Sequence, residues 1–144
     1  MKNTPKTPQL DVFFTLCRDR GLRVTPQRTA IYEELCRSGN HPTAEQIYAA
    51  VKKKFPSISF NTVNETLLTF SRVKLVDIVE GFGSPRRYDP NRSHHHHVHC
   101  VKCGAILDFH NAAFDRLVPP PDIEADYEII NAKVVLTGIC PKCR

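Results

Sequence analysis

Long hydrophobic runs are missing from this 144-residue sequence. No apolar stretch approaches the roughly 20 residues that a helix needs to cross a bilayer, so we expect no membrane contact. The first residues, MKNTPKTPQLD, also lack the apolar segment of a secretory signal, and a cytoplasmic protein is therefore expected. The length suits one domain, or two small lobes that help each other to bury a core.

Excess positive charge is missing from the second part of the chain. Residues 1–89 contain 14 Lys and Arg against 9 Asp and Glu, whereas residues 90–144 contain 6 of each. The net charge of +5 therefore belongs to the first part. A basic half favours a polyanionic partner, because Lys and Arg near phosphates release counterions. An excess of this size is by itself more often a matter of solubility, so the folding pattern has to decide.

Four of the six cysteines form two Cys-x-x-Cys pairs, Cys100 with Cys103 and Cys140 with Cys143. In a cytosolic protein, such pairs indicate a closed tetrahedral zinc site rather than disulfides. Because folding supplies the geometry, the zinc should stabilise the lobe that holds it. A redox-switching dithiol is the competing interpretation, and two matched pairs favour the metal. The other two cysteines lie in apolar helical patterns and are expected to be buried.

The first part of the chain has the pattern of four short helices. A helix is predicted over residues 10–20, and Thr25-Pro26, the capping box Thr43/Gln46, and Ser59 are expected to open the next three. Pro56 is expected to stop the third helix. Apolar spacing predicts the following inward-facing side chains: Leu10, Phe13, Phe14, Cys17, Ala30, Ile31, Leu35, Cys36, Ile47, Val51, Phe55, Val63, Leu67 and Phe70.

Two short extended runs, LVDIVE and PRRYD, flank the turn GFGS and predict a β-hairpin. Helices followed by a small hairpin describe a winged helix-turn-helix, whose fourth helix would enter the major groove of DNA. A small helical domain that binds no nucleic acid is the alternative. The pattern and the charge together favour the DNA-binding interpretation.

From residue 90 onward the pattern changes. HVHCVKCGAILDF predicts strands around the first cysteine pair, NAAFDRL a turn or two of helix, and YEIINAKVVLTGIC a strand pair or one long bent strand. Such a small lobe commonly pairs with a second copy. The expected fold is α+β: a winged helix-turn-helix over 1–89 with a hinge near 89–93, then a small α/β dimerisation domain over 94–144 with the four-cysteine zinc site.

Five histidines lie in the stretch SHHHHVHC. In an extended strand, His95, His97 and His99 point to one side, and His94 and His96 to the other. Asp89 and Asp108 lie nearby in sequence, and nitrogen and oxygen ligands of this kind suit Fe²⁺ or Mn²⁺, and also Zn²⁺. Two chemically different sites in one lobe suggest one permanent and one exchangeable metal.

Five segments together carry a family resemblance: GLRVTPQR, HPTAEQIY, RRYD, HHHHVHCVKCGAILDF and CPKC. Over nearly its full length, the chain resembles the ferric uptake regulator (Fur) family of bacterial metal-dependent repressors. The resemblance implies a winged helix that binds a palindromic DNA operator, a homodimerising lobe, and zinc on the four paired cysteines. It also implies a regulatory metal bound by His41, Asp89, His95, His97 and Asp108. That metal would fix the angle between the lobes, and so the spacing of two recognition helices.

With aspartate at position 108, the chain resembles the peroxide-stress branch of the family. In the iron-uptake branch, the corresponding residue is a glutamate. The resemblance then implies that peroxide reacts at bound Fe²⁺ and that His95 or His41 is oxidised, while Mn²⁺ leaves the repressor insensitive. The main alternative is a repressor that responds to iron or another divalent metal without peroxide chemistry. A metal-storage protein would leave the winged helix idle. A metallohydrolase fits poorly, because the ligands come from separate lobes, so we do not expect an enzyme.

Two departures from the family pattern stand out. The family has Thr-Val-Tyr-Arg in the fourth helix, where this chain has Thr62-Val63-Asn64-Glu65. Asparagine can pair with adenine, and glutamate can accept a hydrogen bond from cytosine N4. These residues would therefore allow an altered operator sequence. A further metal site of some relatives is represented only by His94, His96 and Asp115, and no histidine follows His110. The candidate DNA contacts are Arg18, Arg20, Arg23, Asn61, Thr62, Asn64, Glu65, Arg86 and Arg87, with support from Lys52, Lys53 and Lys54.

Overall fold

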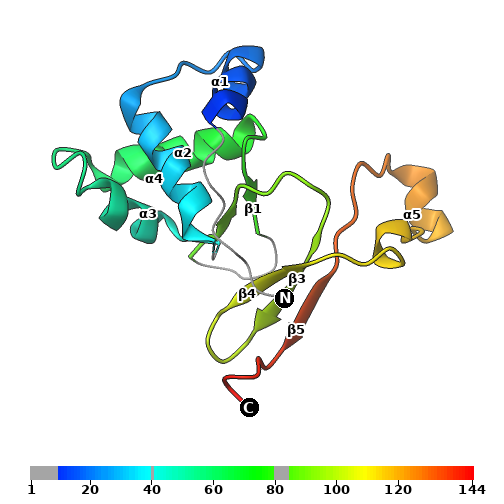
Figure 1. Ribbon diagram of the computed structural model, residues 1–144. Coiled ribbons are helices and arrows are strands. Elements are labelled where there is room, and N and C mark those ends of the chain that lie inside the picture. Colours follow the sequence, from blue (N-terminus) through cyan, green and yellow to red (C-terminus); the bar gives the residue numbers. More distant parts are fainter. Residues whose placement is uncertain (1–9, 40, 80–84) are drawn as a thin grey trace. The chain divides into compact units, whose positions relative to one another are not determined.

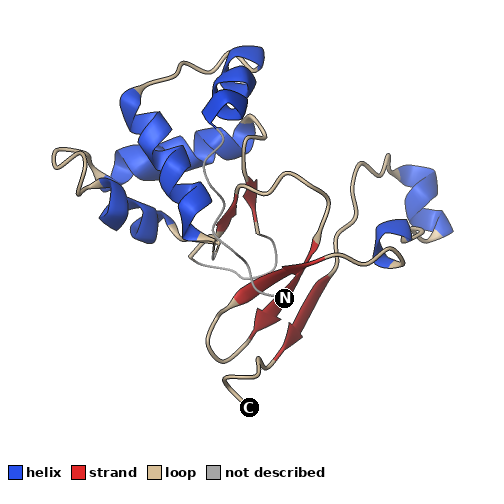
Figure 2. Ribbon diagram, in the orientation of Figure 1, coloured by secondary structure: helices blue, strands red, loops and turns tan. Residues whose placement is uncertain are grey.

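The computed structural model describes residues 10–39, 41–79 and 85–144 (Figure 1). Two compact units divide between Arg92 and Ser93, and each is described by itself. The first unit is mostly helical, and the second contains a three-stranded sheet (Figure 2). Among the described helices, none combines the length and the apolar character that a membrane span requires.

Four helices form most of the first unit: α1 (Leu10–Asp19), α2 (Pro26–Ser38), α3 (Ala44–Val51) and α4 (Phe60–Arg72). Their starts follow the predicted capping signals. The Thr25 hydroxyl accepts a hydrogen bond from the backbone N–H of Arg28 at 3.1 Å, and the Ser59 hydroxyl accepts from Thr62 at 3.1 Å. At α3, both hydrogen bonds of the capping box are present. These side chains satisfy N–H groups that the first turn of a helix leaves unpaired.

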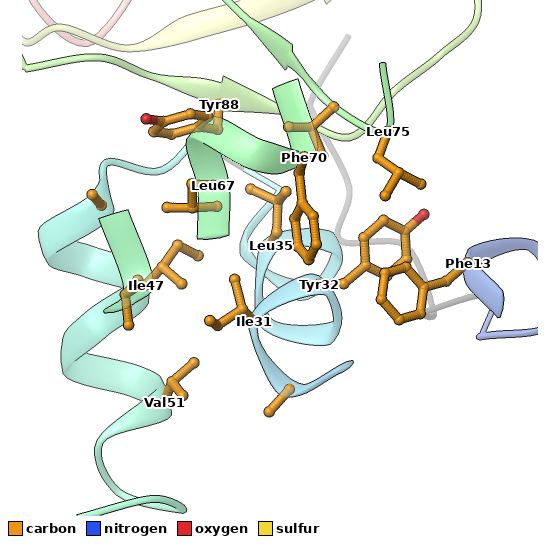
Figure 3. Close-up of a cluster of buried hydrophobic side chains, with 14 of the residues drawn as sticks. Phe13, Ile31, Tyr32, Leu35, Ile47, Val51, Leu67, Phe70, Leu75 and Tyr88 are labelled. Carbon is orange, nitrogen blue, oxygen red and sulfur yellow. The ribbon is translucent and has the colours of Figure 1, made fainter. Parts of the chain in front are cut away.

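The core of the first unit lies between these helices, and α3 packs against both α2 and α4 (Figure 3). The Phe13 ring stacks on the Tyr32 ring, with centroids 4.5 Å apart, and meets the Phe70 ring edge-on at 5.8 Å. Most of the predicted inward-facing residues are confirmed. The buried cluster contains Phe13, Cys17, Ala30, Ile31, Tyr32, Leu35, Ala44, Ile47, Val51, Ile58, Val63, Leu67, Phe70, Leu75, Val76 and Tyr88.

Three details of the helical prediction were wrong. Phe14 is 41% exposed, because residues 13 and 17 already fill the inner face of α1. Tyr32 is buried but was missing from the predicted inward-facing set. Helix α3 ends at Val51 rather than at Pro56, because the backbone closes into three-residue turns from Lys53 to Ala50 and from Lys54 to Val51.

Strands β1 (Asp77–Ile78) and β2 (Tyr88–Asp89) pair antiparallel, with Ile78 opposite Tyr88. The two strands of the predicted hairpin are therefore confirmed, and the predicted turn at residues 81–84 lies outside the described residues. The four helices followed by this strand pair agree with the predicted α+β winged-helix architecture.

The second unit is built on β3 (His96–Cys100), which lies between β4 (Ile106–Phe109) and β5 (Val135–Gly138). β3 pairs antiparallel with β4 and parallel with β5. The predicted strands around the first cysteine pair are confirmed. The predicted turn of helix after them is the short 3₁₀ helix η1 (Phe114–Arg116), and the Asn111 side-chain oxygen accepts hydrogen bonds from the backbone N–H groups of Ala113 and Phe114.

The second unit differs from the sequence analysis in two places. A helix that was not predicted, α5 (Pro121–Asp126), begins at the last of three consecutive prolines. Proline suits the first turn of a helix, and Asp122 and Glu124 favour its positive end. The long strand or strand pair expected over 127–140 is reduced to the four residues of β5, because only His97–Cys100 of β3 are available to pair with it.

Replacing Phe13 with alanine tests the core of the first unit. Because this side chain is fully buried between two other rings, F13A should lower the free energy of unfolding by about 3–5 kcal/mol. The neighbouring F14A should lower it by about 1 kcal/mol or less, because Phe14 is largely solvated. Urea denaturation of the zinc-loaded protein measures both. Equal losses for the two variants would contradict the assigned inner face of α1.

Candidate metal centres and nucleic-acid interface

The sheet of the second unit brings the two cysteine pairs together. Cys100 ends β3 and is opposite Gly138 of the parallel strand β5, so the turn after each strand starts from the same edge. Cys103 follows in the turn after β3, and Cys140 and Cys143 lie in the turn after β5. The four sulfur atoms lie within 4.8 Å of one another. Strand pairing, rather than the cysteines themselves, thus explains how two cysteine pairs with 36 residues between them in sequence meet.

The sulfur geometry fits a zinc ion. Zinc–sulfur bonds of about 2.3 Å in a tetrahedron place neighbouring sulfurs about 3.8 Å apart. The Cys103 and Cys140 sulfurs lie 3.8 Å apart. The Cys100 thiolate is already favoured: hydrogen bonds from the backbone N–H groups of Cys140 and Cys103 lower its pKa to about 6.

The four sulfurs cannot all be thiolates without a cation. Hydrogen bonding to the sulfurs of Cys140 and Cys103 raises the pKa of Cys143 to about 12. Neighbouring thiolates repel one another, so a bound cation such as Zn²⁺ would stabilise all four sulfurs in the deprotonated form. The donor set and its electrostatics therefore fit the predicted structural zinc.

A second group of ligand atoms lies on one face of the same sheet. His97 is directly opposite Asp108 in the β3–β4 pair, and the His97 Nε2 lies 3.2 Å from the Asp108 Oδ1. The His95 Nε2 lies 3.1 Å from the His97 Nε2 and 3.6 Å from the same carboxylate oxygen. The His95 Nδ1 donates a hydrogen bond to the Ser93 carbonyl at 2.6 Å, which leaves the lone pair on Nε2. This is the tautomer that a metal ligand requires.

The first unit contains a matching pair of ligands. The His41 Nε2 lies 3.3 Å from the Asp89 Oδ2, and the other oxygen of Asp89 accepts a hydrogen bond from the backbone N–H of Asn91 at 2.8 Å. His41 has a φ of 50°, in the left-handed region that non-glycine residues seldom adopt. The predicted ligands are therefore gathered in two groups, one in each unit.

Strand β2 holds His41 in this conformation. The Arg87 guanidinium donates a hydrogen bond to the His41 carbonyl, and the backbone N–H of Tyr88 donates to the Pro42 carbonyl at 3.0 Å. Burial lowers the pKa of the Arg87 side chain. Arg87 was predicted as a DNA contact, and the structure gives it a contact that the sequence did not suggest, because it joins the base of the hairpin to His41, a predicted metal ligand.

His94, His96 and Asp115 form a third group on the opposite face of β3. The Asp115 Oδ1 lies 2.7 Å from the His96 Nε2 and 3.3 Å from the His94 Nε2. His96 is fully buried, whereas His94 and Asp115 are exposed. The predicted alternation is thus confirmed for His94 to His97.

The predicted DNA contacts of α4 lie near its N-terminus. Asn61 and Glu65 are exposed, while Asn64 is half-buried and lines a hollow of about 420 Å³ together with Arg86 and Tyr88. Burial raises the pKa of the Tyr88 hydroxyl. The charges of Glu45 and Glu65 also raise this pKa, whereas the charge of Arg86 lowers it. The Thr62 hydroxyl lies 2.9 Å from that of Ser59 and so takes part in the helix cap.

The remaining predicted cations differ in their surroundings. Arg18 is exposed beside Asp19 at 3.5 Å, and Arg23 is exposed. Arg20 is half-buried, and within the described part of the chain its Nη1 is buried without a hydrogen-bond partner. Lys52, Lys53 and Lys54 are exposed in the turn after α3.

Serine substitution of Cys140 tests the zinc assignment. The purified protein is expected to contain about one zinc ion per chain, and C140S should lose it and melt at a lower temperature, because three thiolates bind Zn²⁺ more weakly than four. Elemental analysis and thermal melting followed by circular dichroism measure both effects. C36S is the matched control, since Cys36 is half-buried in α2 and lies outside the sulfur cluster. Retention of zinc in C140S, or its loss in C36S, would refute the assignment.

Comparisons with known proteins agree with this arrangement. The peroxide-responsive repressor PerR of Staphylococcus epidermidis is 35% identical over 136 residues, which cover 94% of this chain and 91% of that protein. The structure of the Campylobacter jejuni peroxide stress regulator superposes with a TM-score of 0.68 at 27% identity, covering 94% of this chain and 99% of that one. The ferric uptake regulator of Helicobacter pylori, described as having three functional metal binding sites, shares the fold with a TM-score of 0.71 at 24% identity over 99% of this chain and 97% of its own. The model of the ferric uptake regulator family matches residues 19–137, and the chain therefore belongs to that family.

Proposed function

We propose that this chain is a cytoplasmic, homodimeric, metal-dependent transcriptional repressor, a regulator rather than an enzyme. Residues up to 89 would bind double-stranded DNA, and residues 94–144 would bind the second copy. The single observation that carries the proposal is the pair of ligand groups, His41 with Asp89 and His95 with His97 and Asp108, one in each unit. The kinship with proteins named as peroxide-responsive repressors supports it.

One exchangeable ion would be bound by both groups. The second unit offers two imidazoles and one carboxylate, and the first unit offers one imidazole and one carboxylate. These nitrogen and oxygen donors suit Fe²⁺ and Mn²⁺. Neither group alone fills the coordination sphere of such a metal, so binding favours the conformations in which both groups reach it. Five protein ligands would leave a position open for peroxide. The metal would thereby control how two recognition helices are spaced on a palindromic operator.

The DNA-binding surface would use the exposed start of α4 and the base of the hairpin. Asn61, Asn64 and Glu65 would face base edges, where Asn64 can pair with adenine and Glu65 can accept from cytosine N4. Thr62, Arg18, Arg20, Arg23, Arg86 and Arg87 would complete the contacts, most of them with phosphates. A glutamate in this helix repels phosphate, so the preferred operator should differ from one that a tyrosine-arginine pair selects.

The dimer surface is expected on the second unit. Many large apolar side chains there are exposed, and Ile130 is 93% exposed. An exposed apolar set of this size marks a protein–protein interface, and most oligomers of soluble proteins are symmetric homodimers. The exposed apolar residues are Val101, Leu117, Val118, Ile123, Tyr127, Ile129, Ile130, Leu136 and Ile139.

Bound Fe²⁺ would supply the one-electron chemistry that activates hydrogen peroxide. The net reaction would transfer one oxygen atom from peroxide to a ring carbon of His95 or His41, with water as the second product. His95 is held for this reaction, because its Nδ1 is bound to the Ser93 carbonyl and its Nε2 faces His97 and Asp108. An oxidised ligand would bind the metal more weakly and release the DNA. The alternative is an iron-responsive repressor in which no histidine is oxidised.

Selection of random duplexes by the Mn²⁺-loaded protein tests the repressor function. The protein should enrich a palindrome, and binding should weaken as salt rises, because phosphate contacts release counterions. In D89N, the Mn²⁺ concentration needed for half-maximal DNA binding should rise by at least about tenfold, since a charged ligand becomes neutral. D122N is the matched control, because Asp122 is an exposed carboxylate of α5 outside every ligand group. Failure to enrich any duplex would leave metal buffering as the better account.

Anaerobic loading with Fe²⁺ followed by hydrogen peroxide separates the two kinds of repressor. Mass spectrometry should find one added oxygen atom on the peptide that contains His95 or the one that contains His41, together with loss of DNA binding. The Mn²⁺-loaded protein should show neither change, because Mn²⁺ does not undergo this reaction with peroxide. If both peptides stay unmodified while DNA binding still follows the metal, the iron-responsive alternative is correct.

A further inference from the structure

The third ligand group, His94, His96 and Asp115, gathers three potential ligand atoms within 4.8 Å of one another. Position alone would make it a metal site. The hydrogen bonds of His96 argue otherwise, because they determine which ring nitrogen carries the proton.

The backbone N–H of Val134 donates a hydrogen bond to the His96 Nδ1 at 3.0 Å. A ring nitrogen that accepts a hydrogen bond carries a lone pair and no proton, so the one proton of the neutral ring is on Nε2. The His96 Nε2 then donates to the Asp115 Oδ1, at 2.7 Å. With both nitrogens engaged in this way, His96 has no lone pair to give to a metal.

His95, its neighbour in sequence, has the opposite arrangement. The His95 Nδ1 donates to a carbonyl, and its Nε2 keeps the lone pair. The two adjacent histidines therefore differ in chemistry: one tautomer can bind a metal, and the other can only join protein groups.

We propose that His96 is a metal-free clamp, which joins β3 to η1 through Asp115 and to the segment before β5 through Val134, and which thereby positions His95 and His97 on the opposite face. The His96 ring is fully buried against Phe109 of β4 and Phe114 of η1, at centroid distances of 5.6 and 5.7 Å. The His96 ring thus contacts residues of β4 and η1, and the segment before β5.

The clamp also acts on the pairing of β3 with β5. The backbone N–H of His97 donates to the Val134 carbonyl at 3.1 Å, and the N–H of the same residue, Val134, donates to the His96 ring. Both polar groups of the Val134 backbone are therefore bound to consecutive residues of β3. This double attachment holds the start of β3, which carries His97 and which His95 directly precedes, so that their Nε2 atoms remain 3.1 Å apart. The positioning part of the proposal rests on the proposed regulatory site, whereas the absence of a third metal does not.

The tautomer can be measured directly. In the full-length protein with Zn²⁺ in the cysteine site and no other metal, nitrogen NMR of ¹⁵N-histidine should show His96 with an unprotonated Nδ1 and a protonated Nε2. Titration with further Zn²⁺ should fill at most one more site and leave the His96 signals unchanged. A third equivalent that binds tightly, with a proton on the His96 Nδ1, would overturn the proposal.

Two substitutions of Asp115 separate a clamp from a metal site. D115N keeps an oxygen that accepts from the His96 Nε2, so it should behave as the wild type in Mn²⁺ affinity and metal content. D115A removes that acceptor, and the affinity of the regulatory site for Mn²⁺ should fall by about tenfold with the number of bound metals unchanged. Loss of a metal ion in D115N would establish a third metal site, and an unchanged Mn²⁺ affinity in D115A would refute the positioning role.

Conservative replacement of His96 provides a second measurement. H96Q can still donate from its amide nitrogen to Asp115, and it should retain more Mn²⁺ affinity than H96A, which can make neither bond. Equal affinities in H96Q and H96A would contradict the clamp. If the protein binds no regulatory metal at all, the proposed function is wrong. The His96 tautomer and the zinc content would still test whether the group of His94, His96 and Asp115 excludes metal.

Discussion

The alternation of side chains along β3 and the two residues before it, His94 and His95, organises the chemistry of the second unit. Successive residues of a strand point to opposite faces, and His95 and His97 therefore share one face with Asp108, while His94 and His96 share the other with Asp115. The same strand ends at Cys100, where its parallel partner β5 delivers the second cysteine pair. A shift of one residue in register would exchange the two faces and separate the cysteines. Fixing that register is therefore the main structural requirement of the unit.

The second unit has few apolar contacts with which to fix the register. Its only described buried hydrophobic residues are Cys100 and Ile106, whereas the first unit buries a continuous cluster between its helices. The burial of His95, His96 and His97 takes the place of an ordinary core, and buried polar groups are stable only when they are paired. In the second unit, the register of the strands is therefore expected to be stabilised by the zinc, the hydrogen bonds of His96 and a second copy of the chain. In the first unit, hydrophobic packing stabilises the fold. Small domains commonly depend on such additions.

The sequence predicted those parts of the fold in which a local signal agrees with the tertiary structure. Thr25, Thr43 and Ser59 cap helices because each can bind the N–H groups that follow it, whatever packs nearby. Phe14 was misassigned because a helical period alone does not show which of two adjacent rings faces the core. The strand over 127–134 was misassigned because its apolar residues are exposed on the second unit, and β-type composition does not reveal whether a neighbouring strand is available.

The candidate sites show a similar division. The paired cysteines were predictable, since the spacing within each pair is local and zinc selects thiolates. The role of Arg87 was not, because a guanidinium at the base of a hairpin looks like a phosphate ligand until its hydrogen bond to the His41 carbonyl is seen. That bond, the bond from Tyr88 to Pro42, and the approach of Asp89 to the His41 ring connect three consecutive residues around β2 to one short loop. A metal bound by His41 and Asp89 would therefore act on the same strand that carries the base of the hairpin. The left-handed φ of His41 has its explanation here, because that backbone conformation is maintained by contacts on both its carbonyl and its ring.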